Sequence, residues 1–336
     1  MAAPTSSDAA AAAPAVALLW HAEALRERLD AYLPGISVEV LARAESTNTL
    51  LLDRARQGSG RRDAPVTTPG ELQVLHSRGD ADIEGGGPFG RRAGDTQSGL
   101  LIAEHQTLGR GRQGRSWQAG AGASLTFSLA LPLAPRDWSG LSLALGVTLA
   151  DALEAPEPGR DPRLLLKWPN DLWLADAAAA SGVGRKLGGV LIETVAVGSR
   201  RMVVVGVGLN IAVLPHWQTR ELSSGFACLQ EIDAAANAPA ALHQVAVPLV
   251  KALRQFEREG FAGFAPAYAR RDLLAGRQVI AHDAAAGQTP LSGTVEGVSN
   301  SGALLLRVGA SLRRVSSGEI SLGNAGAAAP LDGDAG

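Results

Sequence analysis

Cysteine is almost absent from this chain, and its scarcity excludes several kinds of protein. Cys228 is the only cysteine among 336 residues, so no internal disulfide can form and a cysteine-rich metal site is ruled out. A lone cysteine is usually a small buried apolar side chain, and we interpret Cys228 in that way.

The chain also lacks an excess of either charge. It carries 31 basic and 33 acidic residues, which gives a formal net charge of -2. Proteins whose main partner is nucleic acid usually have a strongly basic balance. We therefore expect no specific DNA binding, although a local basic patch is compatible with the count.

Long apolar runs are missing as well. No run approaches the length of about 20 residues that a membrane-spanning helix needs. The first residues, Met1 to Asp8, lack the basic region of a secretory signal, and Pro14 interrupts the alanine-rich stretch that follows. These absences predict a cytoplasmic protein without a membrane segment. Hydrophobic residues make up 46% of the chain, which is enough for the core of one large or two smaller domains.

The most informative stretch runs from Gly109 to Trp117, and we call it the arginine loop. Three glycines alternate with three arginines there, between two strand-like apolar segments. Glycine lets a backbone approach a ligand closely, and arginine offers a planar charged fork that matches carboxylates and phosphates. The pattern predicts a loop that binds an anion.

Three other interpretations of the arginine loop each meet an objection. A solvated linker does not explain why the loop lies between two strands and ends on Trp117. Binding of nucleic acid is disfavoured by the neutral charge balance. Gly109, Gly111 and Gly114 have the G-x-G-x-x-G spacing of a dinucleotide site, but that site needs a helix directly after the glycines. Residues 123–131 alternate like a strand instead, so we reject the dinucleotide interpretation.

The order of the predicted elements indicates an α+β protein. A hydroxyl of Ser46 or Thr47 is placed to cap a helix that begins near Thr49. Residues 57–98 are rich in glycine, arginine, aspartate and proline and form a predicted surface insertion. Helices are expected at 16–32, 139–153, 242–259 and 262–274, and strands at 36–42, 100–104, 123–131, 164–166, 186–193 and 201–207, with a loosened hairpin at 175–185. Short β segments separated by turns begin at Gly276.

A second informative motif, Lys167-Trp-Pro-Asn-Asp171, follows a short predicted strand. The motif could be an ordinary turn, because Pro169 removes a ladder donor and Asn170 and Asp171 favour turns. A lysine at a strand end is also well placed to meet a phosphate or a developing negative charge. The chain carries neither a Ser-His-Asp pattern nor a phosphate loop with G-x-x-x-x-G-K-[ST]. The motifs therefore favour chemistry in which positive charge positions an anionic reactant.

Taken together, these motifs resemble those of the biotin protein ligases, also called holocarboxylase synthetases or biotin–[acetyl-CoA-carboxylase] ligases. They occur in the order found in that family and span about residues 38 to 322. Each motif alone is weak, whereas the arginine loop together with Lys-Trp-Pro-Asn-Asp is specific. The matching stretches are Glu45-Ser-Thr-Asn48, Glu104-x-Gln106, Gly109 to Trp117, Lys167 to Asp171, Lys186-x-Gly-Gly-x-x-x-Glu193, Gly206-x-Gly-x-Asn210 and Gly318-Glu-Ile-Ser-Leu322.

The resemblance implies a fold and a reaction. The fold is an α+β catalytic domain at 16–275, with a mixed β-sheet packed with helices as in class II synthetases, and a small SH3-like β-barrel at 276–323. Residues 1–15 and 324–336 are expected to be disordered tails. In the reaction, biotin and Mg²⁺-ATP give biotinyl-5'-AMP, and a lysine of an apo biotin carboxyl carrier protein then accepts the biotinyl group. The resemblance does not say which carboxylase is the acceptor or whether the enzyme forms a homodimer.

The resemblance also assigns roles to individual residues. Lys167 and Arg112 are the implied catalytic residues, and no protein ligand to the metal is implied. The implied biotin-binding residues are Ser46, Thr47, Asn48, Gln106, Gly109, Arg110, Gly111, Arg112, Lys167, Gly188, Gly189, Gly206 and Gly208. The implied ATP-binding residues are Arg110, Arg112, Arg115, Trp117, Asn170, Asp171 and Asn210.

Two features depart from the family pattern. Many relatives carry an N-terminal winged-helix domain and act as repressors, whereas here a single helix is predicted before the first strand, so DNA binding is not supported. The insertions at 57–98 and 175–185 are unusually long but interrupt no motif. Two alternatives remain: a lipoate–protein ligase of related fold, against which the arginine loop argues, and a nucleic-acid-binding protein that uses the same loop.

Overall fold

The computed structural model describes residues 18–57, 96–179, 181–213, 225–282 and 289–322. Most of the predicted insertion at 57–98, both predicted tails and residue 180 lie outside the described residues. The α-helices of the described part are α1 (Ala22–Asp30), α2 (Thr47–Gln57), α3 (Leu141–Leu153), α4 (Ala238–Glu259) and α5 (Ala265–Arg271).

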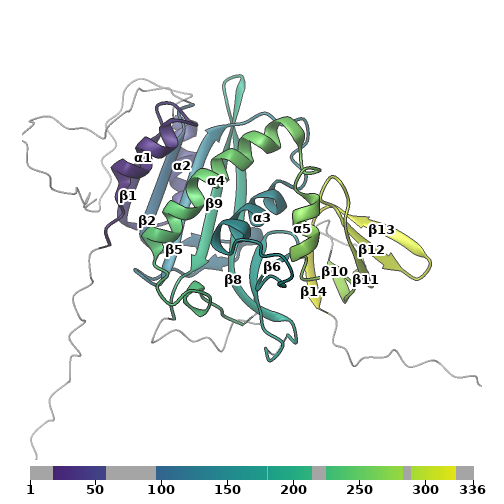
Figure 1. The fold of residues 1–336 in the computed structure, drawn as a ribbon. Helices are drawn as coiled ribbons and strands as arrows, with labels where there is room; N and C mark the ends of the chain where they lie inside the picture. Colours follow the sequence, from purple (N-terminus) through teal and green to yellow (C-terminus); the bar gives the residue numbers. More distant parts are fainter. Residues whose placement is uncertain (1–17, 58–95, 180, 214–224, 283–288, 323–336) are drawn as a thin grey trace, which may run out of the picture.

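A seven-stranded mixed sheet forms the centre of the molecule (Figure 1). Its strand order is β1 (Ser37–Ala44), β2 (Gly99–Gln106), β5 (Ser124–Pro132), β9 (Arg200–Asn210), β8 (Gly184–Val197), β7 (Asp171–Ala175) and β6 (Leu164–Lys167). Strands β1 and β2 pair in parallel, and every other neighbouring pair in this sheet is antiparallel.

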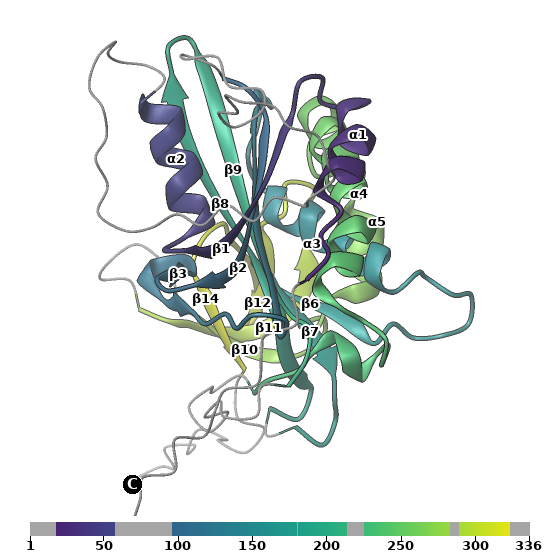
Figure 2. The same ribbon diagram turned by 90° about the vertical axis from the view of Figure 1, so that its left-hand side faces the viewer.

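The two faces of this sheet have different covers. Helices α1, α3, α4 and α5 lie on one face, and α2 lies alone on the other (Figure 2). Strand β5 contributes side chains to both faces. Leu125 and Leu129 pack in the large core under α3 and α4, whereas Ala130 packs in the smaller core under α2. Because both faces are covered, eight of the nine residues of β5 are buried.

A second, five-stranded antiparallel sheet follows α5. Its strand order is β13 (Ser311–Val315), β12 (Leu304–Val308), β11 (Leu291–Val298), β10 (Gln278–His282) and β14 (Glu319–Leu322). The predicted turn at Asn300 to Gly302 connects β11 to β12, and Gly302 has a positive φ of 77°. A large mixed sheet packed with helices, followed by an antiparallel C-terminal sheet, confirms the predicted fold class.

The turn between β11 and β12 contacts the catalytic part. The indole Nε1 of Trp168 donates to the carbonyl of Gly302 over 3.0 Å. Gly302 lies so close to Gly140 that an added Cβ would be 2.6 Å from the Gly140 Cα. Trp168 directly follows Lys167, so this turn of the C-terminal sheet supports the Lys167 motif.

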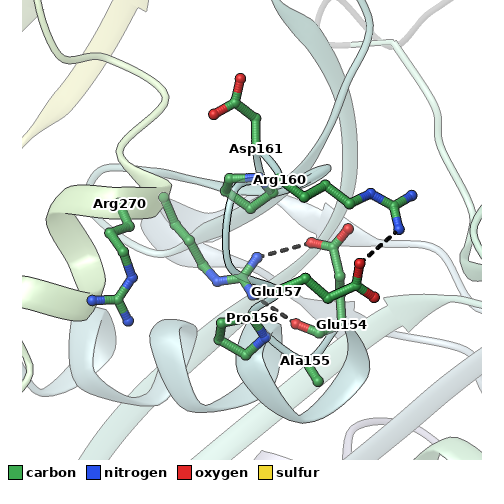
Figure 3. Close-up of a pocket in the computed structure, with 9 residues that line it drawn as sticks. Glu154, Ala155, Pro156, Glu157, Arg160, Asp161 and Arg270 are labelled. Carbon is green, nitrogen blue, oxygen red and sulfur yellow. Dashed lines mark hydrogen bonds and ion pairs between the residues drawn. The ribbon is translucent and has the colours of Figure 1, made fainter.

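A buried arginine holds α5 in place. The Arg271 side chain is only 3% exposed and forms ion pairs with Asp151 and Glu154 at 2.7 and 2.9 Å. The small cavity of about 80 Å³ beside this cluster is shown in Figure 3, where Arg160 reaches across its rim to Glu157. A buried charge is costly without its partner, so removing Asp151 or Glu154 would leave Arg271 less well paired and destabilise the packing of α5.

Several helix boundaries differ from the predicted ones for local reasons. Helix α1 begins at Ala22, later than predicted, because the preceding His21 has a left-handed backbone with a φ of 45°. Helix α4 begins at Ala238, earlier than predicted, because Asn237 caps it by accepting from the Ala240 N–H. Helix α5 ends at Arg271, earlier than predicted, because the next residue pairs with β6.

Candidate active site

The candidate site is a cavity of about 1570 Å³ bounded by the first turn of α2, the arginine loop, several strands of the large sheet and β14. Figure 2 shows the arginine loop strand β3 (Gly109–Arg110) on the same side of the large sheet as α2. Sixteen of the predicted site residues line this cavity: Ser46, Thr47, Asn48, Gln106, Arg110, Gly111, Arg112, Arg115, Trp117, Lys167, Asn170, Asp171, Gly189, Gly206, Gly208 and Asn210.

Two predicted site residues, Gly109 and Gly188, do not line the cavity, and the structure assigns them another task. A Cβ on Gly109 would collide with the Trp117 carbonyl oxygen, and one on Gly188 would lie 2.5 Å from the Gly208 carbonyl oxygen. Both glycines therefore allow neighbouring backbones to pack closely, and their predicted contact with the ligand stays a prediction.

The arginine loop is a tight hairpin. Strand β3 pairs with β4 (Ser116–Trp117), and a single 3-10 turn over Arg112–Gly114 connects them. The Gly111 N–H donates to the Arg115 carbonyl over 2.7 Å, and Gly114 has a positive φ of 74° that suits glycine. No α-helix starts at these described glycines, so the dinucleotide spacing is coincidental.

The three arginines of the loop have different surroundings. Arg110 pairs with Glu193 on β8 at 3.1 Å, and Arg115 pairs with Glu319 on β14. Arg112 is half-buried, and burial lowers the pKa of its guanidinium while the nearby Asp171 opposes that shift. Two arginines thus connect the loop to two separate strands, and the third lines the pocket.

Lys167 ends strand β6, and its ammonium lies 5.2 Å from the ring centroid of Trp173. Burial lowers the pKa of Lys167, the charge of Asp171 raises it, and the positive charges of Lys186 and Arg115 lower it again. A cation held over an aromatic face is stabilised by the ring quadrupole. We call Lys167, Lys186 and Arg112 the cationic end of the pocket.

The first turn of α2 supplies a group of neutral polar side chains. The Ser46 hydroxyl accepts from the Thr49 N–H over 3.4 Å, which confirms its role as a helix cap, and Thr47 is the first helical residue. Gln106 Oε1 accepts from the Thr47 N–H over 2.8 Å, and Ser128 lies 2.6 Å from both Thr47 Oγ1 and Asn48 Oδ1. Thr47, Asn48 and Gln106 line the pocket, and Ser128 on β5 lies buried behind them; we call these four residues the polar end of the pocket.

Glycines shape the wall between the two ends. A Cβ on Gly206 would collide with the Asn48 side chain, and one on Gly208 would lie 2.5 Å from the Trp117 indole. The indole Nε1 of Trp117 is buried, and among the described residues it has no hydrogen-bond partner. Gly206 and Gly208 therefore give room to Asn48 and Trp117 and leave a flat surface between them.

Two amides that line the pocket also support its walls. The Asn170 side-chain nitrogen donates to the Val190 carbonyl over 2.9 Å, and that of Asn210 donates to the Ala227 carbonyl over 3.0 Å. Each amide therefore has one N–H engaged with the protein, and its carbonyl oxygen accepts no hydrogen bond from the described residues.

Sequence reasoning missed several residues of the site. Ser128 and Trp173 carry no sequence signal that separates them from ordinary strand residues. Lys186 and Glu193 begin and end the Lys186-x-Gly-Gly-x-x-x-Glu193 motif, but the sequence predicted no binding or catalytic role for either. In the structure, Lys186 forms an ion pair with Asp171, and Glu193 forms one with Arg110. These partners are far apart in the sequence, so only the fold brings them together.

Two features are absent from the described part of the chain. It contains no group of three or more His, Cys, Asp or Glu side chains placed to hold a metal ion. None of its helices is long and apolar enough to span a membrane.

Comparison with known proteins gives consistent matches. The model of the biotin/lipoate A/B protein ligase family matches residues 92–210, and that of the biotin protein ligase C-terminal domain matches residues 275–323. The chain is 35% identical over 240 residues to the bifunctional ligase/repressor BirA of Escherichia coli K12, with 70% of each chain covered. It is 30% identical over 233 residues to the biotin–[acetyl-CoA-carboxylase] ligase of Paracoccus denitrificans, covering 67% of this chain and 91% of the relative.

Solved structures share the fold. The biotin protein ligase of Aquifex aeolicus in complex with biotin and ATP superposes with a TM-score of 0.58 at 24% identity, covering 85% of this chain and 98% of that one. The motifs, the aligned lengths and the shared architecture agree: this chain belongs to the biotin protein ligase family.

Proposed function

We propose that this protein activates biotin with ATP to biotinyl-5'-AMP and transfers the biotinyl group to a lysine of a biotin carboxyl carrier protein. The observation that carries the proposal is the polarity of the pocket, with a neutral hydrogen-bonding end at Thr47 and Gln106 and a cationic end at Lys167. Biotin has the matching shape, because a neutral ureido ring lies at one end and a carboxylate at the other.

In the first step, a biotin carboxylate oxygen attacks the α-phosphorus of ATP, and the bond from that phosphorus to the bridging oxygen of pyrophosphate breaks. Negative charge develops around the α-phosphate during this step. Lys167 and Arg112 supply positive charge where that charge develops, and burial around each of them lowers the pKa of its side chain.

In the second step, the neutral amine of a carrier lysine attacks the biotinyl carbonyl carbon. The bond from that carbon to the AMP oxygen breaks, AMP leaves and the amine loses a proton. Lys167 is placed to neutralise the departing phosphate. The arginine loop covers the mixed anhydride until the carrier arrives, and ion pairs from Arg110 and Arg115 connect it to β8 and β14.

Magnesium fits this site as a companion of the nucleotide. The two carboxylates that line the described pocket, Asp171 and Glu319, already form ion pairs with Lys186 and Arg115. Mg²⁺ commonly keeps several waters and binds through substrate phosphates. The ion would therefore be held mainly by ATP, where it supplies charge neutralisation.

The direct test incubates the protein with ATP, Mg²⁺, biotin and an apo carrier domain and follows the mass of the carrier. We expect one biotinyl group on the carrier lysine, and loss of the reaction when EDTA removes Mg²⁺. Modification with lipoate in place of biotin would overturn the proposal in favour of a lipoate–protein ligase.

A further inference from the structure

Two neighbouring residues of strand β8, Arg185 and Lys186, face opposite sides of the large sheet. Lys186 lines the pocket, and its ammonium forms an ion pair with Asp171 at 2.8 Å. Successive side chains of a strand point to opposite faces, so Arg185 lies behind the wall that Lys186 presents to the pocket. There its guanidinium forms ion pairs with Asp176 at 2.7 Å and with Glu231 at 2.6 Å. Neither Arg185 nor Glu231 lines the described pocket or has a part in the proposed reaction.

The part of the sheet beside Lys186 is completed by a segment outside the seven strands. The pairing of β9 with β8 ends at Gly188. Beyond that point Phe226 forms a parallel bridge with Lys186, and the Ala227 N–H donates to the Lys186 carbonyl over 2.9 Å. We call residues 225–228 the wall segment, because its first two residues line the pocket next to Lys186.

The side-chain amide of Asn210 joins the wall segment to β8. Its nitrogen donates to the Ala227 carbonyl over 3.0 Å and to the Lys186 carbonyl over 3.5 Å. Asn210 lines the pocket and is one of the predicted ATP-binding residues. The place of its amide therefore depends on how closely the wall segment lies against β8.

Arg185 fastens the wall segment from behind. Its Nη1 donates to the Phe226 carbonyl over 2.7 Å, and Nη1 and Nη2 donate to the two carboxylate oxygens of Glu231 at 3.1 and 2.6 Å. Glu231 Oε1 also accepts from the Cys228 N–H over 3.0 Å. A two-pronged contact between an arginine and a carboxylate fixes direction as well as distance. The wall segment is thus held at Phe226 and at Cys228 by one arginine–glutamate pair.

The surroundings of this pair favour its charged form. Hydrogen bonding to Glu231 raises the pKa of Arg185. Burial raises the pKa of Glu231, but the hydrogen bonds from Arg185 and the Cys228 N–H outweigh it and keep that pKa below its usual value. Gly225, with a positive φ of 66°, leaves room for the arginine, because a Cβ there would lie 2.8 Å from Arg185 Cγ. The wall segment is therefore built around an ionised Arg185.

We propose that Arg185 and Glu231 are positioning residues for the nucleotide: they hold the wall segment against β8 and so fix the Asn210 amide where ATP binds. Their ring of contacts includes no residue of the polar end. Loss of the pair therefore weakens nucleotide binding and leaves biotin binding nearly unchanged. The proposal rests on the proposed function in taking ATP as the ligand of this end of the pocket.

The test measures dissociation constants for two probes, biotin and α,β-methylene-ATP with Mg²⁺, by calorimetry. The methylene group replaces the bridging oxygen that would leave with pyrophosphate, so the nucleotide binds without reacting even when biotin is present. In Arg185→Ala we expect the nucleotide to bind at least about tenfold more weakly, because a charged hydrogen-bonded contact is lost, and biotin to bind within about twofold of the parent protein. An unchanged nucleotide affinity, or an equal loss for both probes, would overturn the proposal.

Further variants separate positioning from a loss of folding. Arg185→Lys keeps the charge but cannot bond Phe226 and both oxygens of Glu231 at once, so its nucleotide dissociation constant should lie between those of the parent protein and Arg185→Ala. If Arg185→Ala does not fold, parent-like nucleotide binding in Arg185→Lys refutes the proposal. Glu231→Ala should weaken nucleotide binding by a similar factor, and the double variant by no more than the larger single effect. Additive losses would show that the two residues do not act as one pair.

Arg163→Ala is the matched control. Arg163 also contacts Glu231, but its Nη2 donates to the backbone carbonyl over 2.8 Å, outside the ring that holds the wall segment. Its removal should leave both dissociation constants within about twofold of the parent values. A nucleotide loss equal to that of Arg185→Ala would contradict the role of the pair. If the parent protein binds the nucleotide but does not biotinylate the carrier, the proposed function fails and the positioning role stands; if it binds no nucleotide, the positioning role fails.

Discussion

At the polar end of the pocket, Thr47, Asn48 and Ser128 are buried and bonded to one another. At the cationic end, Lys167 rests over an indole ring, while the arginines of the neighbouring loop are held by partly exposed ion pairs; the Arg115 side chain is 63% exposed. Buried, fully bonded networks hold one geometry, whereas exposed ion pairs are weak and easily exchanged. One end is suited to recognise a ring of fixed shape, and the other to admit a nucleotide and release its products.

This comparison predicts that the largest effect lies at the cationic end. Lys167→Ala should lower the rate of adenylate formation about a thousandfold, because charge developing at the phosphate loses its nearest buried cation. The biotin dissociation constant should change much less. Pyrophosphate release and equilibrium binding measure the two quantities, and an unchanged rate of pyrophosphate release would refute the role of Lys167.

A second change tests whether the arginine loop retains the intermediate. Arg112→Gly removes a half-buried charge and loosens the turn, so we expect biotinyl-5'-AMP to leave the protein about tenfold to a hundredfold faster. A chase experiment with labelled adenylate gives this rate. Arg136→Gly changes an exposed arginine outside the described pocket and serves as the control. Equal retention in both variants would contradict the role of Arg112.

A smaller effect is expected at the polar end. Thr47→Val keeps the shape of the side chain but removes the oxygen that the ligand meets, and it also leaves Ser128 without its partner. The biotin dissociation constant should rise about tenfold, while ATP binding stays the same. Calorimetry with each substrate measures both values, and an equal loss of ATP affinity would show that the two ends are not separate.

The smallest predicted change concerns pH. Asp171 raises the pKa of Lys167, so Asp171→Asn should lower that pKa. Lys167 is charged below its pKa, and therefore the loss of adenylation rate on the alkaline side should begin at a lower pH in the variant. Biotin binding at the neutral polar end should stay flat across the same range. If the alkaline fall in the adenylation rate begins at the same pH in both proteins, the titration of Lys167 is not its cause.

Local signals made the main elements and much of the site predictable. Glycines, prolines and helix caps act on residues next to them in the sequence, so the arginine loop, the turn after Lys167 and the cap at Ser46 could be predicted from the local sequence. Contacts between distant strands could not be predicted in this way. Asn48 and Glu193 are 145 residues apart, and Ser128 resembles any strand serine until α2 packs over it. The close packing at Gly109 and Gly188 was not predictable for the same reason, since the backbones that crowd them come from elsewhere in the hairpin or sheet.

The parallel pairing of β1 with β2 has a practical consequence. Parallel neighbours require a long crossover, and here it begins with α2, whose first turn faces the pocket and whose last residue is Gln57. Strand β2 returns at Gly99 and reaches the pocket only at Gln106. The chain between Gln57 and Gly99 is therefore attached at both ends away from the reacting groups.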